Sequence, residues 1–435
     1  MSKYKHCIIL FIIFAIISFK KVKNHFSSKY DIRSLFKIRV AFYCMSLKYG
    51  GVERVTSILL NYLSKKKLFT LFLITTKPRL DDEYPLSDNI IRISLSNHKR
   101  NLFKQIKKEK IDILIYNFYD KNEIKRLNKL KKIKVIYYNH SSYFIWLFYH
   151  IFNFEKSIYN VYKNCKYVLS LIPLENDYLF KIWGIKSIFI NNPSTYEYDS
   201  VIPSNLSTKN IIMIGRGDDP TKRFELGILA MKDIIKEIPN CKMNIISESY
   251  NILQSSIKTL NLSKYVKIVG YQKNPELYFT NASLHIFPSI CDTYPMVISE
   301  TKIFGIPTII CGVDYLALAK NGTVIIYDNN PNYLAREAIN ILNDEKYRKK
   351  LGLEARESMK AIKNDLIINK WTTLLLSVYR GIDSVVIQNL LNDEYIPIKH
   401  KEANEILNNQ LNIYKKHFPQ LKEATLDNLK LFLFE

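Results

Sequence analysis

From residue 37 onward, short β-rich runs alternate with segments whose apolar residues recur at helical spacing, and this alternation restricts the fold more than any other feature. Between two such runs, residues 52–66 place Val52, Val55 and Leu59 on one face of a helix. Strands separated by helices predict parallel βαβ units, because parallel neighbours need a long crossover connection. The strands expected in the first half are 37–44, 69–75, 111–116, 133–138, 166–171 and 186–190.

A second series of the same kind follows residues 191–210, a polar stretch without periodicity that we interpret as an interdomain linker. Helices are expected over 331–362 and over 365–381, and the latter is placed to cross back to the first half. The other elements expected here are strands at 211–215, 242–246, 265–269, 283–287 and 307–311, with helices over 223–238, 250–261 and from 295.

The fold class predicted from this pattern is α/β, with two facing Rossmann-like domains, an N-terminal apolar segment and a helical C-terminal extension. A chain of 435 residues is long enough for this arrangement. The expected divisions are an N-terminal apolar and basic segment at 1–36, the two Rossmann-like domains at 37–195 and 205–362, a crossing helix at 363–381 and a helical tail at 382–435.

Residues 7–19 form an apolar run with lysines on both sides. As a helix the run spans about 20 Å at about 1.5 Å per residue, less than a hydrocarbon core of about 30 Å. It is compatible with a secretory h-region, although no small-x-small cleavage site follows, and with a short signal anchor or an in-plane membrane helix. A buried helix is disfavoured because the run has no polar face. We therefore expect association with a membrane.

The chain is strongly basic, with 64 Lys and Arg against 40 Asp and Glu and a formal net charge of +24. Such a balance predicts an anionic partner. Residues 99–134 alone hold thirteen Lys or Arg against four Asp or Glu. This stretch is compatible with a solvated helical face or with docking on an anionic membrane. A nucleic-acid-binding protein is disfavoured, because no module of that kind is recognisable.

Several common motifs are missing from the sequence. No G-x-G-x-x-G follows either first strand, which argues against an ordinary dinucleotide oxidoreductase. A P-loop lysine motif, H-E-x-x-H and D-x-D are absent, so phosphate chemistry here must use protein cations and helix dipoles. The run Asp81-Asp82-Glu83 is interpreted as solvated charge. None of the six cysteines form a C-x-x-C pair, which indicates neither a zinc site nor a disulfide framework and favours a reducing compartment.

Polar residues gather at three corners that follow expected strands, where doubly wound sheets bind ligands. At the first corner, Gly50 and Gly51 would let backbone amides approach a phosphate or sugar closely, although a plain tight turn explains them as well. At the second, Arg216 leaves a strand and Lys222 opens the next helix, so a short loop can aim both cations at one anion. Surface charge paired with neighbouring aspartates is the alternative there.

The third corner runs from Asp292 to Glu300. Pro295 fits the first position of a helix, so that the backbone amides of residues 294–297 would face a ligand. Glu300 lies about one turn into that helix on an otherwise apolar stretch. A carboxylate there can accept the paired hydroxyl donors of a ribose. Two acids eight residues apart are common by chance, but their placement on either side of a proline-started helix is less so.

These residues resemble the family 4, or group 1, glycosyltransferases of GT-B fold over roughly residues 37–381. The strand that leads to His140 adds a match to the acceptor-side histidine of that family. The other matches are the G-G-x-E-R turn at 50–54, the G-R-x5-K element at 215–222, and the E-x7-E element at 292–300 with its trailing G-x-P at 305–307.

The sequence departs from that family at three places. The first acid of E-x7-E is Asp292, one methylene shorter than glutamate, and Thr293 stands where the family usually has glycine. Ser247-Glu248-Ser249 replaces a turn that is commonly rich in glycine. The first two departures bear on how a donor sugar would fit.

The resemblance implies a retaining hexosyltransferase that uses a nucleotide diphosphate sugar as donor, with no metal and no other cofactor. Its acceptor side would be residues 37–195, and the nucleotide sugar would bind 205–362. Arg216 and Lys222 would neutralise the leaving diphosphate. His140 would contact the sugar or approach the acceptor hydroxyl, and a hydrogen-bonded loop histidine is the alternative. In a front-face mechanism the departing phosphate accepts the acceptor's proton, so no dedicated nucleophile is needed.

The resemblance also assigns residues to substrate binding. Glu300 would hold the ribose hydroxyls, Asp292 would bind a hydroxyl of the donor sugar, and Tyr271 would lie near the base. Contacts to phosphate or sugar would come from Gly50, Gly51, Thr293, Tyr294, Pro295 and Met296.

Together with the apolar run and the basic stretch, the resemblance implies an enzyme at a membrane surface, with its domains on the cytoplasmic side. Its acceptor would be a glycan or a lipid-linked acceptor in surface polysaccharide or glycolipid synthesis, and no nucleic acid is expected as a partner. A GT-B protein that binds nucleotide sugar without transferring it is the alternative, motivated by Asp292 and Thr293.

Overall fold

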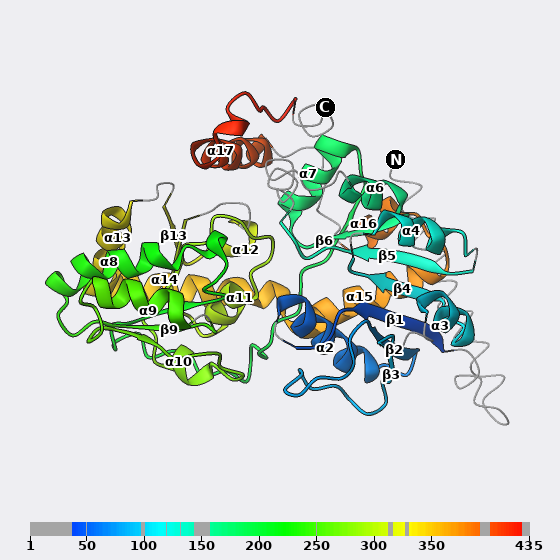
Figure 1. The fold of residues 1–435 in the computed structure, drawn as a ribbon, viewed down its shortest axis with the longest axis horizontal. Coiled ribbons are helices and arrows are strands. Elements are labelled where there is room, and N and C mark those ends of the chain that lie inside the picture. The colour runs from blue at the N-terminus through cyan, green and yellow to red at the C-terminus, as the bar shows by residue number, and fades with distance from the viewer. Residues whose placement is uncertain are drawn as a thin grey trace, which may run out of the picture.

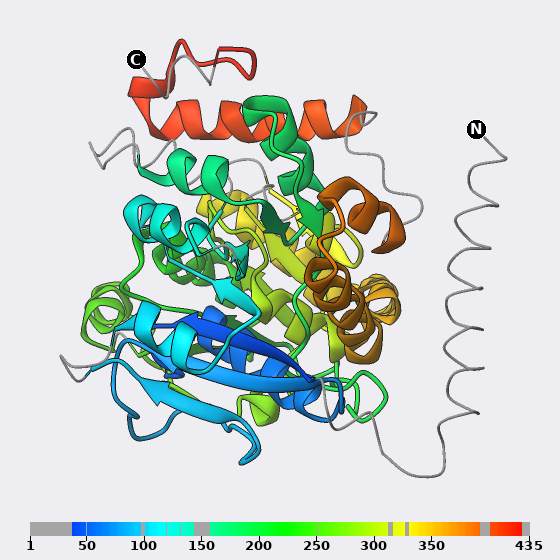
Figure 2. The ribbon, with the colours of Figure 1, turned by 90° about the vertical axis from the view of Figure 1, so that its right-hand side faces the viewer.

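The computed structural model describes residues 37–428, except 49, 97–100, 119, 131, 143–156, 249, 312–315, 327–329 and 392–400. The apolar run expected at 7–19 lies outside these residues. The chain forms two lobes, which lie side by side in Figure 1, while Figure 2 views the first lobe in front of the second. Each lobe holds one parallel sheet flanked by helices. The predicted α/β class with two Rossmann-like domains is confirmed.

The sheet of the first lobe has the strand order β3-β2-β1-β4-β5-β6-β7, and every pair is parallel. The central β1 places Val40 opposite Leu71 of β2 and Ile113 of β4. The strands are β1 Ile38–Cys44, β2 Phe69–Thr75, β3 Ile91–Ser94, β4 Ile113–Tyr116, β5 Lys134–Tyr138, β6 Tyr167–Ser170 and β7 Ile188–Phe189. Six of them match expected runs, and only the short edge strand β3 was not predicted.

Helices cover both faces of this sheet. The first of them, α2, buries Val55, Leu59 and Leu63 against the core, which the apolar spacing predicted. In α4, the side chain of the cap residue Asp120 accepts bonds from two amides of the first turn. The helices of the lobe are α2 Gly51–Ser64, α3 Leu102–Lys108, α4 Lys121–Asn128, α6 Ser157–Asn164 and α7 Pro173–Trp183.

The sheet of the second lobe has the order β10-β9-β8-β11-β12-β13 and is also parallel throughout. Only β13 was not predicted. The strands are β8 Asn210–Ile214, β9 Lys242–Ile246, β10 Val266–Ile268, β11 Leu284–Phe287, β12 Thr308–Ile310 and β13 Thr323–Ile325. The helices around them are α8 Phe224–Glu237, α9 Tyr250–Thr259, α10 Glu276–Thr280, α11 Met296–Ile303 and α12 Leu316–Ala319.

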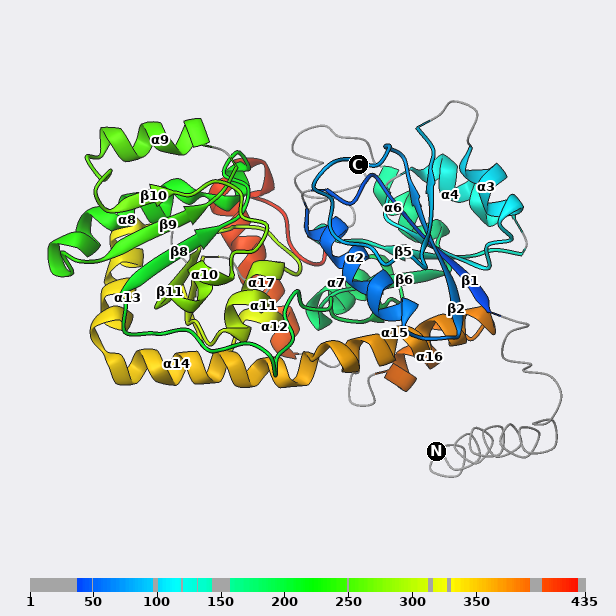
Figure 3. The same ribbon diagram turned by 90° about the horizontal axis from the view of Figure 1, so that it is seen from below.

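A row of helices runs along one edge of both lobes (Figure 3). The single helix expected over 331–362 is divided into α13 Pro331–Asn343, α14 Glu345–Ser358 and the 3-10 turn η3 Met359–Ile362. Asp344 makes the division, because its side chain accepts the Tyr347 amide and caps α14. α15, Asn364–Tyr379, crosses to the first lobe, where Trp371 packs on Phe42 and Tyr138.

The segments outside the two sheets are more buried than their polar sequences suggested. Tyr198 and Val201 of the expected linker are buried against Phe279 and Phe304 of the second lobe. The tail forms α16 Ser384–Leu391, α17 Lys401–His417 and the 3-10 turn η4 Pro419–Leu421, with a buried apolar face on α17. Among the described residues, no helix has the length and apolar character to cross a membrane.

Candidate functional site

Loops that follow strands of the two sheets meet between the lobes. The loop after β5 contacts the loop after β11, where the Thr293 hydroxyl donates to the Ser141 carbonyl at 2.7 Å. The Tyr294 hydroxyl donates to the carbonyl of Asn192, which leads from the first lobe to the second, at 3.2 Å. The carboxyl-end loops of the two sheets therefore share one interface, the position at which sheets of this type bind ligands.

Glu300 lies on α11 at this interface with only 1% of its surface exposed. Its Oε1 atom accepts from Nη1 of Arg54 at 2.6 Å and from the Thr195 hydroxyl at 2.5 Å. The carboxylate raises the pKa of the Arg54 guanidinium, so the guanidinium stays charged. The predicted ribose ligand Glu300 is thus paired with a cation from the opposite lobe.

Two tyrosines extend this contact across the interface. The Arg54 guanidinium lies over the Tyr84 ring, 5.1 Å from its centroid, and also bonds to the Tyr84 hydroxyl. Tyr84 in turn shares a hydrogen bond with Tyr271 of the second lobe. Tyr271 is 38% exposed, in the loop after β10. The residue predicted to lie near the base is therefore joined through Tyr84 to the group around Glu300.

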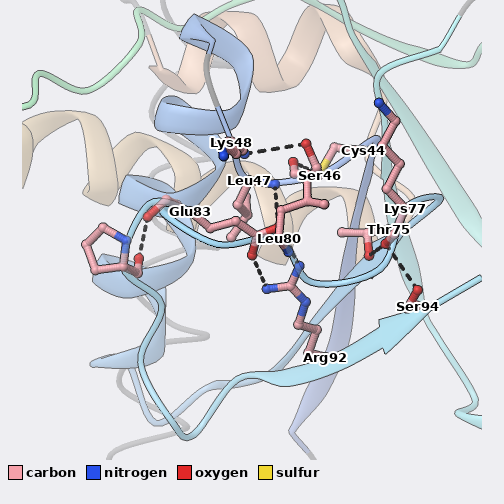
Figure 4. Close-up of polar contacts among 12 residues, drawn as sticks. Cys44, Ser46, Leu47, Lys48, Thr75, Lys77, Leu80, Glu83, Arg92 and Ser94 are labelled. Carbon is pink, nitrogen blue, oxygen red and sulfur yellow. Dashed lines mark hydrogen bonds and ion pairs between the residues drawn. The ribbon is translucent and has the colours of Figure 1, made fainter. Parts of the chain in front are cut away.

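The loop that carries Tyr84 is held by Glu83 (Figure 4). The Glu83 carboxylate accepts from the Leu47 amide at 3.4 Å and from the Leu80 amide at 3.2 Å, and it pairs with the Arg92 guanidinium at 2.9 Å. The Tyr84 amide donates to the Leu47 carbonyl at 2.9 Å. The interpretation of residues 81–83 as solvated charge is therefore wrong for Glu83, which anchors the loop.

The two glycines of the first corner lie where α2 begins. Gly50 has an extended backbone with φ −173°, and the Glu53 carboxylate folds over the place a side chain would fill. A Cβ atom on Gly51 would lie 3.9 Å from Cγ of Met296 in α11. Burial raises the pKa of Glu53, and the charge of Arg216 opposes that rise. Gly51 and Met296, both predicted to contact the donor, thus face each other between the lobes.

Lys222 contacts Asp292, the first acid of the E-x7-E element, with 2.6 Å between Nζ and Oδ2. Burial lowers the lysine pKa, but the aspartate outweighs it, so the net pKa is raised and the ammonium stays charged. Lys222 ends the 3-10 turn η2 Pro220–Lys222. The expectation that Lys222 opens the next helix is therefore wrong. Arg223 adopts a left-handed conformation there, with φ 48°, and α8 begins only at Phe224.

Arg216 lies at the start of the same loop, with 73% of its side chain exposed and a 2.7 Å contact to Asp219. Gly215, which precedes it, has φ 154°, a value that side chains with a Cβ rarely adopt. The Gly217 amide donates to the Ser247 hydroxyl at 2.9 Å, so the serine that replaces a glycine-rich turn supports this loop. Arg216 and Lys222 therefore share one loop, each with its own aspartate partner.

The start of α11 differs by one residue from the expectation. Pro295 is the extended cap residue, and the helix begins at Met296. Thr293, Tyr294 and Pro295 are buried at the interface, and the Thr293 amide donates to Oδ1 of Asp292 at 3.0 Å. The threonine that stands in place of glycine thus bonds both to Asp292 and, through its hydroxyl, to the first lobe.

His140 lies two residues beyond the end of β5, beside the Ser141 carbonyl that binds Thr293. The centroid of its ring lies 4.0 Å from the centroid of the Tyr138 ring. Burial lowers the pKa of the His140 imidazole to about 3. The imidazole is therefore neutral at physiological pH. Its buried Nε2 atom has no hydrogen-bond partner among the described residues. Such an atom is suited to one hydrogen bond from or to a ligand hydroxyl.

The predicted residues form two neighbouring groups joined by α11. One group consists of Lys222, Asp292, Thr293 and the His140 loop, and the other is built on Glu300, Arg54, Tyr84 and Tyr271. The pairing of Arg54 and the position of Tyr84 were not predicted, although Arg54 belongs to the G-G-x-E-R turn. No cluster of three His, Cys, Asp or Glu side chains suited to a metal occurs in the part of the chain that the structure describes.

Comparison with known proteins agrees with this fold and these loops. Residues 195–358 match the model of the family Glycosyl transferases group 1. A curated relative, the poly(glycerol-phosphate) alpha-glucosyltransferase of Bacillus subtilis (strain 168), is 28% identical over 193 residues, which are 43% of this chain and 27% of that protein. The matched stretch is thus little more than a quarter of the relative's length.

Solved structures of similar fold cover more of the chain. The sucrose-phosphate synthase of Thermosynechococcus elongatus superposes with a TM-score of 0.66 and 16% identity, over 79% of this chain and 100% of that one. HepE from Anabaena, in complex with UDP and glucose, superposes with a TM-score of 0.61 and 12% identity, over 78% and 100%. The predicted resemblance to the group 1 glycosyltransferases is confirmed over residues 195–358, and the two-lobed fold is similar to that of these solved structures.

Proposed function

We propose that this protein is a retaining glycosyltransferase that moves a hexosyl-type sugar from a nucleotide diphosphate sugar to an acceptor, without a metal. The observation that carries the proposal is the pair of cations on one loop, Arg216 and Lys222, of which Lys222 contacts Asp292 just before α11. Two cations there can stabilise the charge that develops on a leaving diphosphate. The family match over residues 195–358 supports the same activity.

In this mechanism Lys222 releases Asp292 when the donor binds, because the diphosphate offers a stronger partner for the ammonium. Asp292 is then available to a hydroxyl of the donor sugar. The shorter side chain of Asp292 and the neighbouring Thr293 would position that hydroxyl. The neutral His140 accepts or donates one hydrogen bond near the acceptor hydroxyl. The departing phosphate takes the acceptor's proton, so that no protein base is required.

The acceptor is a glycan or lipid-linked acceptor with anionic surroundings. Two observations support this assignment. The helices α3 and α4 carry exposed basic residues, among them Lys104, Lys107, Lys108 and Lys125. The curated relative named above acts, by its name, on poly(glycerol-phosphate), a polymer of negative charge. We further propose that this protein works on the cytoplasmic side of a membrane, in surface polysaccharide or glycolipid synthesis.

A thermal-shift panel of UDP-, GDP- and ADP-sugars tests the proposal first. One nucleotide class is expected to raise the melting temperature, and a transfer assay with that donor should then release the nucleoside diphosphate in an acceptor-dependent way. EDTA should leave the rate unchanged, and loss of activity with EDTA would refute the metal-free mechanism. Protection without turnover on any acceptor would favour the alternative, a GT-B protein that only binds nucleotide sugars.

A further inference from the structure

The C-terminal helix α17 lies outside both Rossmann-like domains and contacts both of them. In Figures 1 and 2 it lies beside α7 of the first lobe. Its residues Leu407, Leu411 and Tyr414 are buried in the core that the first lobe shares with the loop after β11. On the exposed side, Lys181 of α7 donates to the Asn404 side chain at 2.8 Å.

Gln410 is the only residue with a side-chain amide among the buried residues that the structure describes in α17, and 0% of its surface is exposed. Its position between Leu407 and Leu411 faces the apolar core, where a leucine would pack without any polar atom to satisfy. Its Nε2 atom donates to the Ile290 carbonyl at 3.2 Å. A buried amide is costly unless it is bonded, so packing alone does not account for a glutamine here.

Ile290 lies two residues before Asp292, in the loop that leads to α11. Its amide donates to the Thr221 carbonyl at 3.0 Å, and Thr221 immediately precedes Lys222. The peptide groups of Ile290 thus join the Lys222 loop on one side to α17 on the other. Within the loop, the Ser289 hydroxyl donates to the Cys291 carbonyl at 3.1 Å.

We infer that Gln410 is a positioning residue for the donor sugar, which holds the loop of Ile290 so that Asp292 keeps the position from which it reaches the sugar. The tail therefore completes the donor site from outside the two domains. The identity of the donor in this inference rests on the proposed function. The clamp, by which we mean the hydrogen bond from Gln410 that holds the Ile290 loop, does not. Gln410 itself touches the Ile290 carbonyl, and its effect on the sugar passes through Asp292.

The test compares Gln410→Leu with two control variants of the same helix in the full chain. Gln410→Leu keeps the packing and removes the bond to Ile290. Leu411→Ala weakens packing only, and Asn404→Ala removes the contact to α7. Amide hydrogen exchange of the segment 288–295 and dissociation constants for UDP-glucose and UDP are measured for each variant, with GDP-mannose and GDP used if the wild type prefers guanine nucleotides.

Gln410→Leu is expected to speed exchange in 288–295 and to raise the ratio of the UDP-glucose to the UDP dissociation constant about tenfold, since the sugar contact is loosened while the nucleotide contacts remain. Both control variants should leave that ratio unchanged, even where Leu411→Ala lowers the melting temperature. Unchanged exchange in Gln410→Leu would overturn the clamp, and faster exchange with an unchanged ratio would overturn the effect on the sugar. If the wild type binds no nucleotide, the proposed function fails, while the exchange result still decides the clamp.

Discussion

The side chains of Arg54 and Glu300 meet between the two lobes, with 2.6 Å between Nη1 and Oε1. They are separated by 246 positions in the sequence, and each comes from the first helix beyond a ligand-binding corner of its own lobe. The Oε1 atom of the carboxylate that the proposed mechanism assigns to a ribose is therefore already occupied. A ribose that uses this oxygen atom competes with Arg54 for it.

Arg54→Ala is expected to bind UDP about tenfold more tightly than the wild type, because the ribose no longer competes with an ion pair. The ligand-free variant should lose roughly 3 kcal/mol of unfolding free energy, since Glu300 stays buried without its cation. Isothermal titration with UDP and urea unfolding measure the two effects. Arg39→Ala, which breaks the pair with Glu109 at the amino end of the first sheet, is the control and should not change UDP affinity. Weaker UDP binding by Arg54→Ala would instead make Arg54 a nucleotide ligand.

Lys222→Ala should lower the rate of sugar transfer by about 10²–10³-fold, because the ammonium stabilises charge that appears only as the diphosphate departs. Arg216→Ala is expected to act in the same direction. Initial rates with saturating donor measure this loss, and circular dichroism checks that both variants remain folded. Lys236→Ala, an exposed lysine of α8 paired with Asp233, serves as the matched control. Rates near that of the wild type in both variants would refute the assigned role.

Gly51 allows a graded test of the space between α2 and α11. Gly51→Ala should have little effect, because its Cβ atom would make an ordinary 3.9 Å contact with Met296. Gly51→Leu should weaken binding of UDP-glucose strongly, because a longer side chain would fill the space assigned to the donor. The melting temperature should fall little in either variant, since Gly51 is exposed at the helix start. Equal donor affinity in the two variants would place the donor elsewhere.

The arrangement of strands was predictable because most of them are buried on both faces and appear as continuous apolar runs. The two missed strands show the limit of that signal. β3 has four residues with only Ile93 buried, and β13 has three residues, none of them fully buried. Such short edges carry no periodicity, and only pairing with a neighbouring strand defines them.

The corners of the site were likewise predictable, because local motifs mark the turns after β1, β8 and β11. The partners of their charges were not. Spacing alone could not place Arg54 against Glu300 or Lys222 against Asp292, since these pairs depend on how two separate lobes meet. Glu83 is a further example: its local sequence indicates a solvated loop, but donors from Leu47, Leu80 and Arg92 converge on its carboxylate.

Glu175 is fully buried in the first turn of α7, and its carboxyl group accepts the Leu171 amide at 2.6 Å. Burial raises its pKa from 4.5 to about 8. Between these two pH values the folded protein keeps a proton that the unfolded chain has lost, so the unfolding free energy falls as pH rises, by up to about 1.4 kcal/mol per pH unit. Glu175→Gln removes this titration and should gain stability over the wild type between pH 6 and pH 8.

Urea unfolding at pH 6, 7, 8 and 9, followed by circular dichroism, measures the difference between the two proteins. The difference should widen up to about pH 8 and then level off, because above that value both states of the wild type have lost the proton. Glu225→Gln, at an exposed position in the first turn of α8, provides a control whose difference from the wild type should stay nearly constant. A constant difference for Glu175→Gln as well would mean that Glu175 is ionised in the folded protein, and that the first turn of α7 holds a buried negative charge.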